Sequence, residues 1–343
     1  MSVNPPQGGV CLCVLGMHRS GTSALMRLLD LLGVEIGSDL WPAGPDNPTG
    51  FWESRPIVQT HDELLDSLQS AFDDFWPLPD GWETRAEIQP IRKKLIDMVR
   101  SQLAVKPLWG FKDPRTCRLV PLWRTIFNEL GTSPRYVVLM RHPREIAGSL
   151  AAQNGMSINH ALLMTMEHVR AAELSTRSER RVLVTYDQLL TDWRATAARI
   201  AHELGITWPV PIEQAETAVA AFLDPGRRHQ RAGSRQAESL ADPRLLDRAQ
   251  RQHEILAQAA AGKKLSTRAL DRVGRRLVGD LVRHAGWRDT RSARREIITL
   301  TAWAAERTRA IEFLTSENRY FRNKLGEPPA DPSDPSIRPH AIH

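Results

Sequence analysis

Residues 10–29, VCLCVLGMHRSGTSALMRLL, constrain the fold more than any other stretch of the chain. A continuous apolar run ends at Gly16, a short loop follows, and a helical pattern begins after Gly21. A strand, a glycine-bounded loop and a helix in this order form a cradle in which backbone N–H groups and the helix N-terminus bind an anion. The glycine spacing is that of a Walker A loop, but Thr22 stands where that motif has its lysine. The stretch therefore predicts an anion site that differs from an ordinary ATP site.

Short apolar runs bounded by turn or helix signals recur along the N-terminal part of the chain. Most are continuous rather than alternating, as expected for strands covered on both faces of a parallel sheet. Helical patterns lie between them, and this alternation predicts an α/β fold with a doubly wound, mostly parallel sheet flanked by helices. The predicted strands are residues 10–16, 33–37, 108–112, 135–141 and 181–186. The predicted helices are residues 22–32, 58–70, 88–103, 120–130, 143–153, 159–175 and 192–204.

Strand signals stop after about residue 221, and the remaining sequence is helical and rich in arginine. We therefore expect an α/β domain at 1–225, an Arg-rich helical extension at 226–290, a long heptad-like helix at 291–326 and a disordered tail at 327–343. In the heptad-like helix, apolar residues recur at alternating steps of four and three. Such a helix either packs on its own domain, which we favour, or forms a short coiled coil and hence a homodimer.

Charge is unevenly distributed over the 343 residues, whose net charge is +6. Residues 227–309 hold 20 Lys and Arg against 9 Asp and Glu. Such a basic face suits an anionic lipid, an acidic glycan or a solvated helical surface; nucleic acid is not expected, because no zinc-finger or RNA-recognition signature accompanies it. Three cysteines are too few for a disulfide framework, no apolar run approaches the roughly 18 residues of a membrane helix, and the signal-peptide pattern is missing. We expect a cytoplasmic protein without a membrane span.

The loop between the two glycines carries His18 and Arg19 in place of the Walker lysine. That lysine neutralises the terminal phosphates of a nucleotide beside a Mg²⁺ ion. An anion cradle without that lysine suggests a different donor group. A sulfuryl group carries one negative charge fewer than a terminal phosphoryl group, so its transfer needs less positive charge from the protein and no metal. The segment HRSGTS resembles the 5′-phosphosulfate loop of the sulfotransferase superfamily, in the RSGTS variant found in its glycan-, protein- and bacterial-type members.

This resemblance implies a P-loop-kinase-like fold, 3′-phosphoadenosine 5′-phosphosulfate (PAPS) as co-substrate, and no metal. It covers roughly residues 10–230 and leaves the last hundred or so outside. The residues that it assigns to the cofactor in this loop are His18, Arg19, Ser20, Gly21, Thr22 and Ser23.

Two further segments match the superfamily. In YVVLMRHPREIAGSL, Arg141 at a strand end is followed eight residues later by Ser149, the interval of the superfamily's 3′-phosphate site. An arginine fork and a hydroxyl near a helix start suit a phosphate dianion. In VLVTYDQLL, Tyr186 resembles the tyrosine that lies near the adenine. The superfamily's late RKG segment is matched only loosely, by Arg227 and Arg228 in a predicted basic lid.

Transfer to a hydroxyl requires a base near the acceptor and positive charge near the leaving oxygen. Lys112 ends a predicted strand and resembles the superfamily's lysine at the bridging oxygen. Glu53 is the predicted base, because its aromatic, proline-bounded loop would bury it and raise its pKa. His61 and Asp62 on the following helix are the alternative bases. The alternative to a catalytic role for Glu53 is an ion pair with Arg55 or with another arginine of the loop.

The sequence thus predicts a metal-independent sulfotransferase that moves a sulfuryl group from PAPS to a hydroxyl, with a carbohydrate or glycoconjugate as the acceptor. Two other functions stay open at this point. One is a P-loop kinase of small molecules or nucleosides that uses ATP and Mg²⁺. The other is a non-catalytic nucleotide-binding module that acts through its basic helical half.

Overall fold

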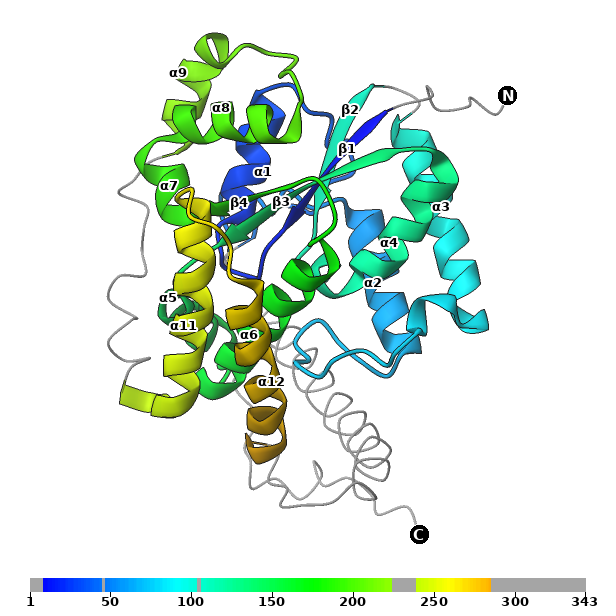
Figure 1. Ribbon diagram of the computed structural model, residues 1–343. Helices are drawn as coiled ribbons and strands as arrows, with labels where there is room; N and C mark the ends of the chain where they lie inside the picture. Colours follow the sequence, from blue (N-terminus) through cyan, green and yellow to red (C-terminus); the bar gives the residue numbers. More distant parts are fainter. Residues whose placement is uncertain (1–8, 45–46, 104–105, 224–238, 285–343) are drawn as a thin grey trace, which may run out of the picture. The chain divides into compact units, whose positions relative to one another are not determined.

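The computed structural model describes residues 9–44, 47–103, 106–223 and 239–284 (Figure 1). Arg227 and Arg228 of the predicted lid, the heptad-like helix at 291–326 and the tail at 327–343 lie outside the described residues.

Four parallel strands form the sheet, in the order β2-β1-β3-β4. β1 is Val10–Leu15, β2 is Leu108–Lys112, β3 is Ser133–Met140 and β4 is Arg181–Thr185. The predicted α/β class and parallel sheet are confirmed. The predicted strand at 33–37 is wrong: only an isolated bridge from Glu35 to Trp109 occurs there, because the glycines at both ends of this run have positive φ angles that interrupt an extended chain.

Helices connect the strands and follow them. They are α1 (Thr22–Leu31), α2 (Arg55–Ser67), the 3₁₀ helices η1 (Trp82–Thr84) and η2 (Ala86–Ile88), α3 (Gln89–Leu103), α4 (Thr116–Leu130), α5 (Pro143–Asn154), α6 (Ile158–Ser175), α7 (Tyr186–Thr191), α8 (Trp193–Leu204), α9 (Ile212–Phe222), α11 (Pro243–Ala260) and α12 (Thr267–His284). The helix predicted at 58–70 begins and ends three residues earlier, since Pro56 occupies the first turn, where its missing N–H costs nothing.

Both faces of the sheet are buried, and β1 shows how. Cys11, Cys13 and Leu15 point into one apolar cluster, with residues of α2 to α6, α11 and α12. Leu12 and Val14 point into the other, with residues of α1, α8 and α9. A strand that is apolar at every position can therefore be buried on both faces, as the continuous sequence run predicts.

The strand order places the loop after β1 beside the end of β3. From β1 the chain passes to β2 on one side and then crosses to β3 on the other side of β1 (Figure 1). Ligands of open α/β sheets bind at the carboxyl ends of the strands where the order reverses. The fold therefore brings the loop at residues 16–21 next to Arg141, which directly follows β3.

Part of the Arg-rich extension packs on the α/β core. Leu245 and Leu256 of α11 and Leu277 of α12 are buried in the same apolar cluster as Cys11, Cys13 and Leu15 of β1. Asp242 caps α11 by accepting hydrogen bonds from the backbone N–H groups of Arg244 and Leu245. Within the described residues, no helix is both long enough and apolar enough to span a membrane.

Candidate active site

The loop between β1 and α1 requires glycine at both of its ends. Gly21 has a φ of +97°, and a Cβ atom there would lie 2.3 Å from Cδ2 of Tyr186. A Cβ atom on Gly16 would lie 2.8 Å from the carbonyl oxygen of Leu139. Arg19, at a φ of 66°, also adopts the left-handed conformation that side chains other than glycine rarely take. The two glycines therefore permit close approach of β3 and Tyr186 to the loop.

The residues predicted for the two ends of the nucleotide lie in contact with one another. Arg19 Nε donates to Ser149 Oγ at 3.0 Å, and Arg141 Nη1 donates to the carbonyl oxygen of Arg19 at 3.0 Å. The Arg141 guanidinium lies 4.8 Å from the ring centroid of Tyr186. Arg141 also pairs with Glu145, at 2.7 Å. Segments that are 130 residues apart in sequence thus meet at one edge of the sheet.

The other loop residues differ in what they offer a ligand. Ser20 is 1% exposed, and its hydroxyl has no hydrogen-bond partner among the described residues. Burial lowers the pKa of His18 well below its usual range, so this ring is neutral, and its Nε2 atom is also without a partner in the described part of the chain. Thr22 and Ser23 begin α1 and place their hydroxyls at its N-terminus. The loop therefore supplies hydroxyls and backbone N–H groups, with positive charge from Arg19.

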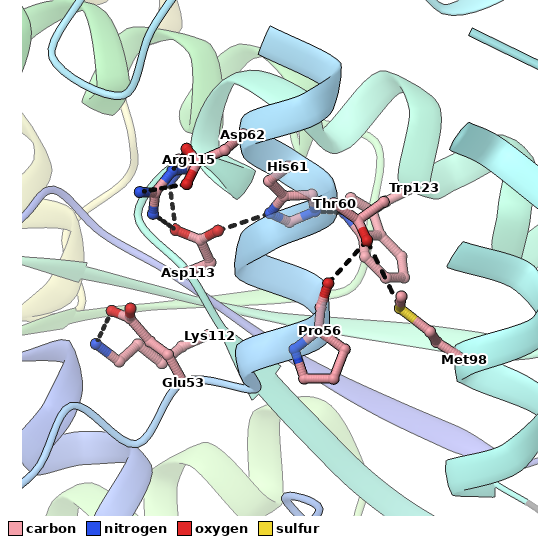
Figure 2. Close-up of polar contacts among 10 residues, drawn as sticks. All are labelled: Glu53, Pro56, Thr60, His61, Asp62, Met98, Lys112, Asp113, Arg115 and Trp123. Atoms are coloured by element: carbon pink, nitrogen blue, oxygen red, sulfur yellow. Dashed lines mark hydrogen bonds and ion pairs between the residues drawn. The ribbon is translucent and has the colours of Figure 1, made fainter. Parts of the chain in front are cut away.

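Lys112 pairs with the predicted base Glu53 (Figure 2) and also contacts the first turn of α1. Its side chain is 3% exposed, and Nζ lies 2.5 Å from Glu53 Oε1 and 3.1 Å from Ser23 Oγ. Burial raises the pKa of the Glu53 carboxyl, and the charge of Lys112 opposes this rise. The predicted alternative partner, Arg55, instead pairs with Asp39. The ammonium group thus stands between a buried carboxylate and the start of α1.

The loop that carries Glu53 is held in a strained conformation. Trp52 has a φ of 58°, an outlier for a bulky side chain that costs on the order of 1–3 kcal/mol. Its indole Nε1 donates to the carbonyl oxygen of Thr49 at 3.0 Å, and the Arg27 guanidinium lies 4.5 Å from its ring centroid. Asn47 Nδ2 donates to the carbonyl oxygen of Gly50 at 2.7 Å. These contacts hold the loop backbone in the conformation in which Glu53 faces Lys112.

His61 belongs to a buried hydrogen-bond chain rather than to an open site (Figure 2). Trp123 Nε1 lies 2.9 Å from His61 Nε2, and His61 Nδ1 lies 2.7 Å from Asp113 Oδ2. Because an indole N–H only donates, His61 Nε2 accepts, and Nδ1 carries the proton that is donated to Asp113. His61 is 0% exposed, and both ring nitrogens are occupied, so it has no nitrogen free to take a proton from an acceptor.

Arg115 continues this chain to the surface. Its Nη1 donates to Asp113 Oδ1 at 2.9 Å, and its Nε donates to Asp62 Oδ1 at 2.6 Å. Burial raises the pKa of Asp113, but the charge of Arg115 and the hydrogen bond from His61 outweigh it and hold this pKa well below its usual range. Burial also raises the pKa of Asp62, whose side chain is 45% exposed. Asp62 is therefore a paired carboxylate at the solvent-exposed end of this hydrogen-bond chain.

A family model described as "Sulfotransferase family" matches residues 12–210, more than half of the 343 residues. The chain belongs to the sulfotransferase family. This membership confirms the predicted class of enzyme, a sulfotransferase with PAPS as its co-substrate. Within the described residues, no group of three or more His, Cys, Asp and Glu side chains is arranged to hold a metal ion.

Three solved structures also match the chain. The sulfotransferase domain from the Synechococcus PCC 7002 olefin synthase is 18% identical, with a TM-score of 0.38 over 72% of this chain and 96% of that one. The sulfotransferase domain from the curacin biosynthetic pathway is 14% identical, with a TM-score of 0.35 over 80% and 98%. Retinol dehydratase, in complex with androsterone and the inactive cofactor PAP, is 13% identical, with a TM-score of 0.33 over 76% and 82%. No curated protein matches the chain.

Several contacts in this sulfotransferase were not anticipated from its sequence. Asn47 Nδ2 lies 3.3 Å from Ser23 Oγ and links the Glu53 loop to the start of α1. The sequence NPTG signals a turn at Asn47, but not the residue that its amide meets. Asp113 bridges His61 and Arg115. Long-range pairings of this kind carry no local sequence signal.

Proposed function

We propose that this sulfotransferase moves the sulfuryl group of PAPS to a hydroxyl group of a carbohydrate or glycoconjugate, with Glu53 as the base and Lys112 beside the leaving oxygen. One observation carries this proposal: the buried ammonium of Lys112 contacts Glu53 on one side and Ser23, at the N-terminus of α1, on the other. A base and a cation in contact at the mouth of an anion cradle are the two groups that sulfuryl transfer to a hydroxyl requires.

The donor fits the residues of the loop and of the β3 edge. The unpartnered hydroxyl of buried Ser20, the N-terminus of α1 and the charge of Arg19 suit the 5′-phosphosulfate. Arg141 and Ser149 suit the 3′-phosphate, since a guanidinium and a hydroxyl converge there through Arg19. Tyr186, whose ring packs on Gly21 and under Arg141, offers a face for the adenine.

The chemistry assigned to the chain is a proton transfer and a charge stabilisation. As the acceptor oxygen forms its bond to sulfur, Glu53 takes the hydroxyl proton, and the bond from sulfur to the bridging phosphate oxygen breaks. The electron pair stays on that oxygen, and the positive charge of Lys112 stabilises it. The raised pKa of Glu53 makes its carboxylate a stronger base than an exposed glutamate. The sulfated acceptor and 3′,5′-bisphosphoadenosine are the products.

A calorimetric titration of the full chain tests the donor assignment. We expect 3′,5′-bisphosphoadenosine to bind without metal and more tightly than ATP with Mg²⁺. Preference for ATP with Mg²⁺, together with its turnover, would instead support a kinase. In a second arm, Glu53→Gln should keep bisphosphoadenosine affinity and lose about 10²–10⁴-fold in kcat. Equal activity of Glu53→Gln and wild type would remove Glu53 as the base. Bisphosphoadenosine binding without turnover of any hydroxyl acceptor would favour a non-catalytic module.

A further inference from the structure

Phe72 is an exposed aromatic side chain in contact with the active site. Its side chain is 40% exposed, whereas most large apolar side chains among the described residues are buried. Its ring centroid lies 5.6 Å from that of His18 and 5.5 Å from the Arg115 guanidinium carbon. His18 belongs to the loop after β1, and the charge of Arg115 acts on Glu53. Phe72 therefore exposes an apolar surface beside the loop after β1 and beside Arg115.

The exposure of Phe72 is built into the fold. Arg118, only 4% exposed, reaches under the loop that carries Phe72. Its guanidinium donates to the carbonyl oxygen of Ala71 at 3.1 Å, to Ser70 Oγ at 2.9 Å and to the carbonyl oxygen of Trp76 at 2.8 Å. Two of these hydrogen bonds, to Ala71 and Trp76, hold the backbone on both sides of Phe72, and the third holds the Ser70 side chain. A ring that is exposed on an anchored loop is a preformed contact surface.

Asp62 is connected to this ring through Arg115. Arg115 lies over the Phe72 ring and pairs with Asp62 through both of its carboxylate oxygens, at 2.6 and 3.3 Å. A carboxylate has about four acceptor positions, so the 45% exposed Asp62 can accept further hydrogen bonds. In Figure 2, Asp62, Arg115 and the Glu53–Lys112 pair lie on the same side of α2, with Trp123 on the other.

We propose that Phe72 and Asp62 form an acceptor subsite for a neutral pyranose ring, a step that rests on the function proposed above. The axial C–H groups of such a ring form an apolar face that stacks on Phe72, and its hydroxyls donate to Asp62. One hydroxyl then points toward Glu53. The cations Lys112 and Arg115 are already paired with the carboxylates of Glu53, Asp62 and Asp113, so a neutral acceptor suits this region better than an acidic one.

Glycan-array binding of the full chain, loaded with 3′,5′-bisphosphoadenosine, tests the subsite. We expect the wild-type protein to bind neutral terminal pyranosides. Phe72→Ala should lower that affinity about tenfold, and Phe72→Trp should retain it, because a larger ring keeps the stacking surface. Leu174→Ala is the matched control, since it truncates an apolar side chain that is 48% exposed on α6. Bisphosphoadenosine affinity should be the same in all four proteins, which shows that the donor site is intact.

Three outcomes would overturn the subsite: unchanged glycan affinity in Phe72→Ala, binding restricted to acidic glycans, or no glycan bound while bisphosphoadenosine binds. Each of these leaves the donor site standing. The proposed use of PAPS as the sulfuryl donor fails by a different result, namely wild-type protein that does not bind bisphosphoadenosine at all.

Discussion

Arg19 Nε donates a hydrogen bond to Ser149 Oγ at 3.0 Å, across 130 residues of sequence. The bond joins the loop after β1 to helix α5 after β3, at the point where the strand order reverses. Arg141 adds a second tie by donating to the Arg19 carbonyl oxygen. The residues proposed for the 5′-phosphosulfate and for the 3′-phosphate are therefore in direct hydrogen-bond contact.

Arg141→Ala should separate the two phosphate sites. Loss of a hydrogen-bonding charge should lower affinity for 3′,5′-bisphosphoadenosine about 10–100-fold, while adenosine 5′-phosphate, which lacks the 3′ group, should change little. Calorimetry with both ligands measures the difference. Arg124→Ala is the control, because that arginine is half-exposed and pairs with Glu179. Equal losses for the two ligands would contradict a 3′-phosphate role for Arg141.

Gly21→Ala should abolish donor binding without unfolding the chain. The added Cβ would lie 2.3 Å from the Tyr186 ring, at a φ of +97° that side chains rarely adopt. The double variant Gly21→Ala/Tyr186→Ala removes the clash but also removes the ring proposed to face the adenine, so it should recover stability without recovering affinity. Thermal unfolding and bisphosphoadenosine titration together check this. Gly155→Ala, also at positive φ but with nothing within 4 Å, is the control for strain alone. Donor affinity equal to wild type in Gly21→Ala would refute the cradle geometry.

Lys112→Met should move the acidic limb of the pH–rate profile to higher pH. In the wild type, burial raises the Glu53 pKa and the Lys112 charge opposes that rise. Without the charge, the pKa rises further, and the base works only when deprotonated. The acidic limb of kcat/KM should therefore move to higher pH by about 1–3 units, with a fall in kcat of about 10²–10³-fold.

A pH–rate profile of Lys112→Met, with Lys94→Met beside it, checks this expectation. Lys94 pairs with Glu63 on the surface, where both side chains are exposed, so its loss should leave the profile unchanged. An acidic limb at the wild-type position in Lys112→Met would show that Glu53 is not the titrating base.

Asp113→Asn should destabilise the fold by about 3–5 kcal/mol at neutral pH, because it leaves the buried charge of Arg115 without its closest buried partner. The folded-state pKa of Asp113 lies below its unfolded value, so this stability is present above the ordinary aspartate pKa and is lost as pH falls. The difference from wild type in urea unfolding should therefore shrink below about pH 4. Asp39→Asn, in an exposed pair with Arg55, should cost less than about 1 kcal/mol. A difference that does not change with pH would contradict the assignment.

The sequence predictions are most accurate for features that depend on interactions between residues close together in the sequence. The four confirmed strands and the start of α1 at Thr22 depend on apolar runs and glycine positions within about ten residues of chain. The run at 33–37 misled because its composition resembles a strand, while its flanking glycines bend the backbone. The apolar period of a segment thus identifies its element type, and local turns decide whether that element forms.

The sequence by itself determined the parallel α/β fold, the glycine-bounded loop between Gly16 and Gly21, and the family to which its motifs point. These follow from side-chain periodicity and from backbone conformations open only to glycine, both of which are local. Only the tertiary structure decided that Glu53 pairs with Lys112 rather than Arg55, and that both nitrogens of His61 are occupied. Those pairings depend on how α2 packs across the end of β2. That packing is set by contacts between side chains more than fifty residues apart.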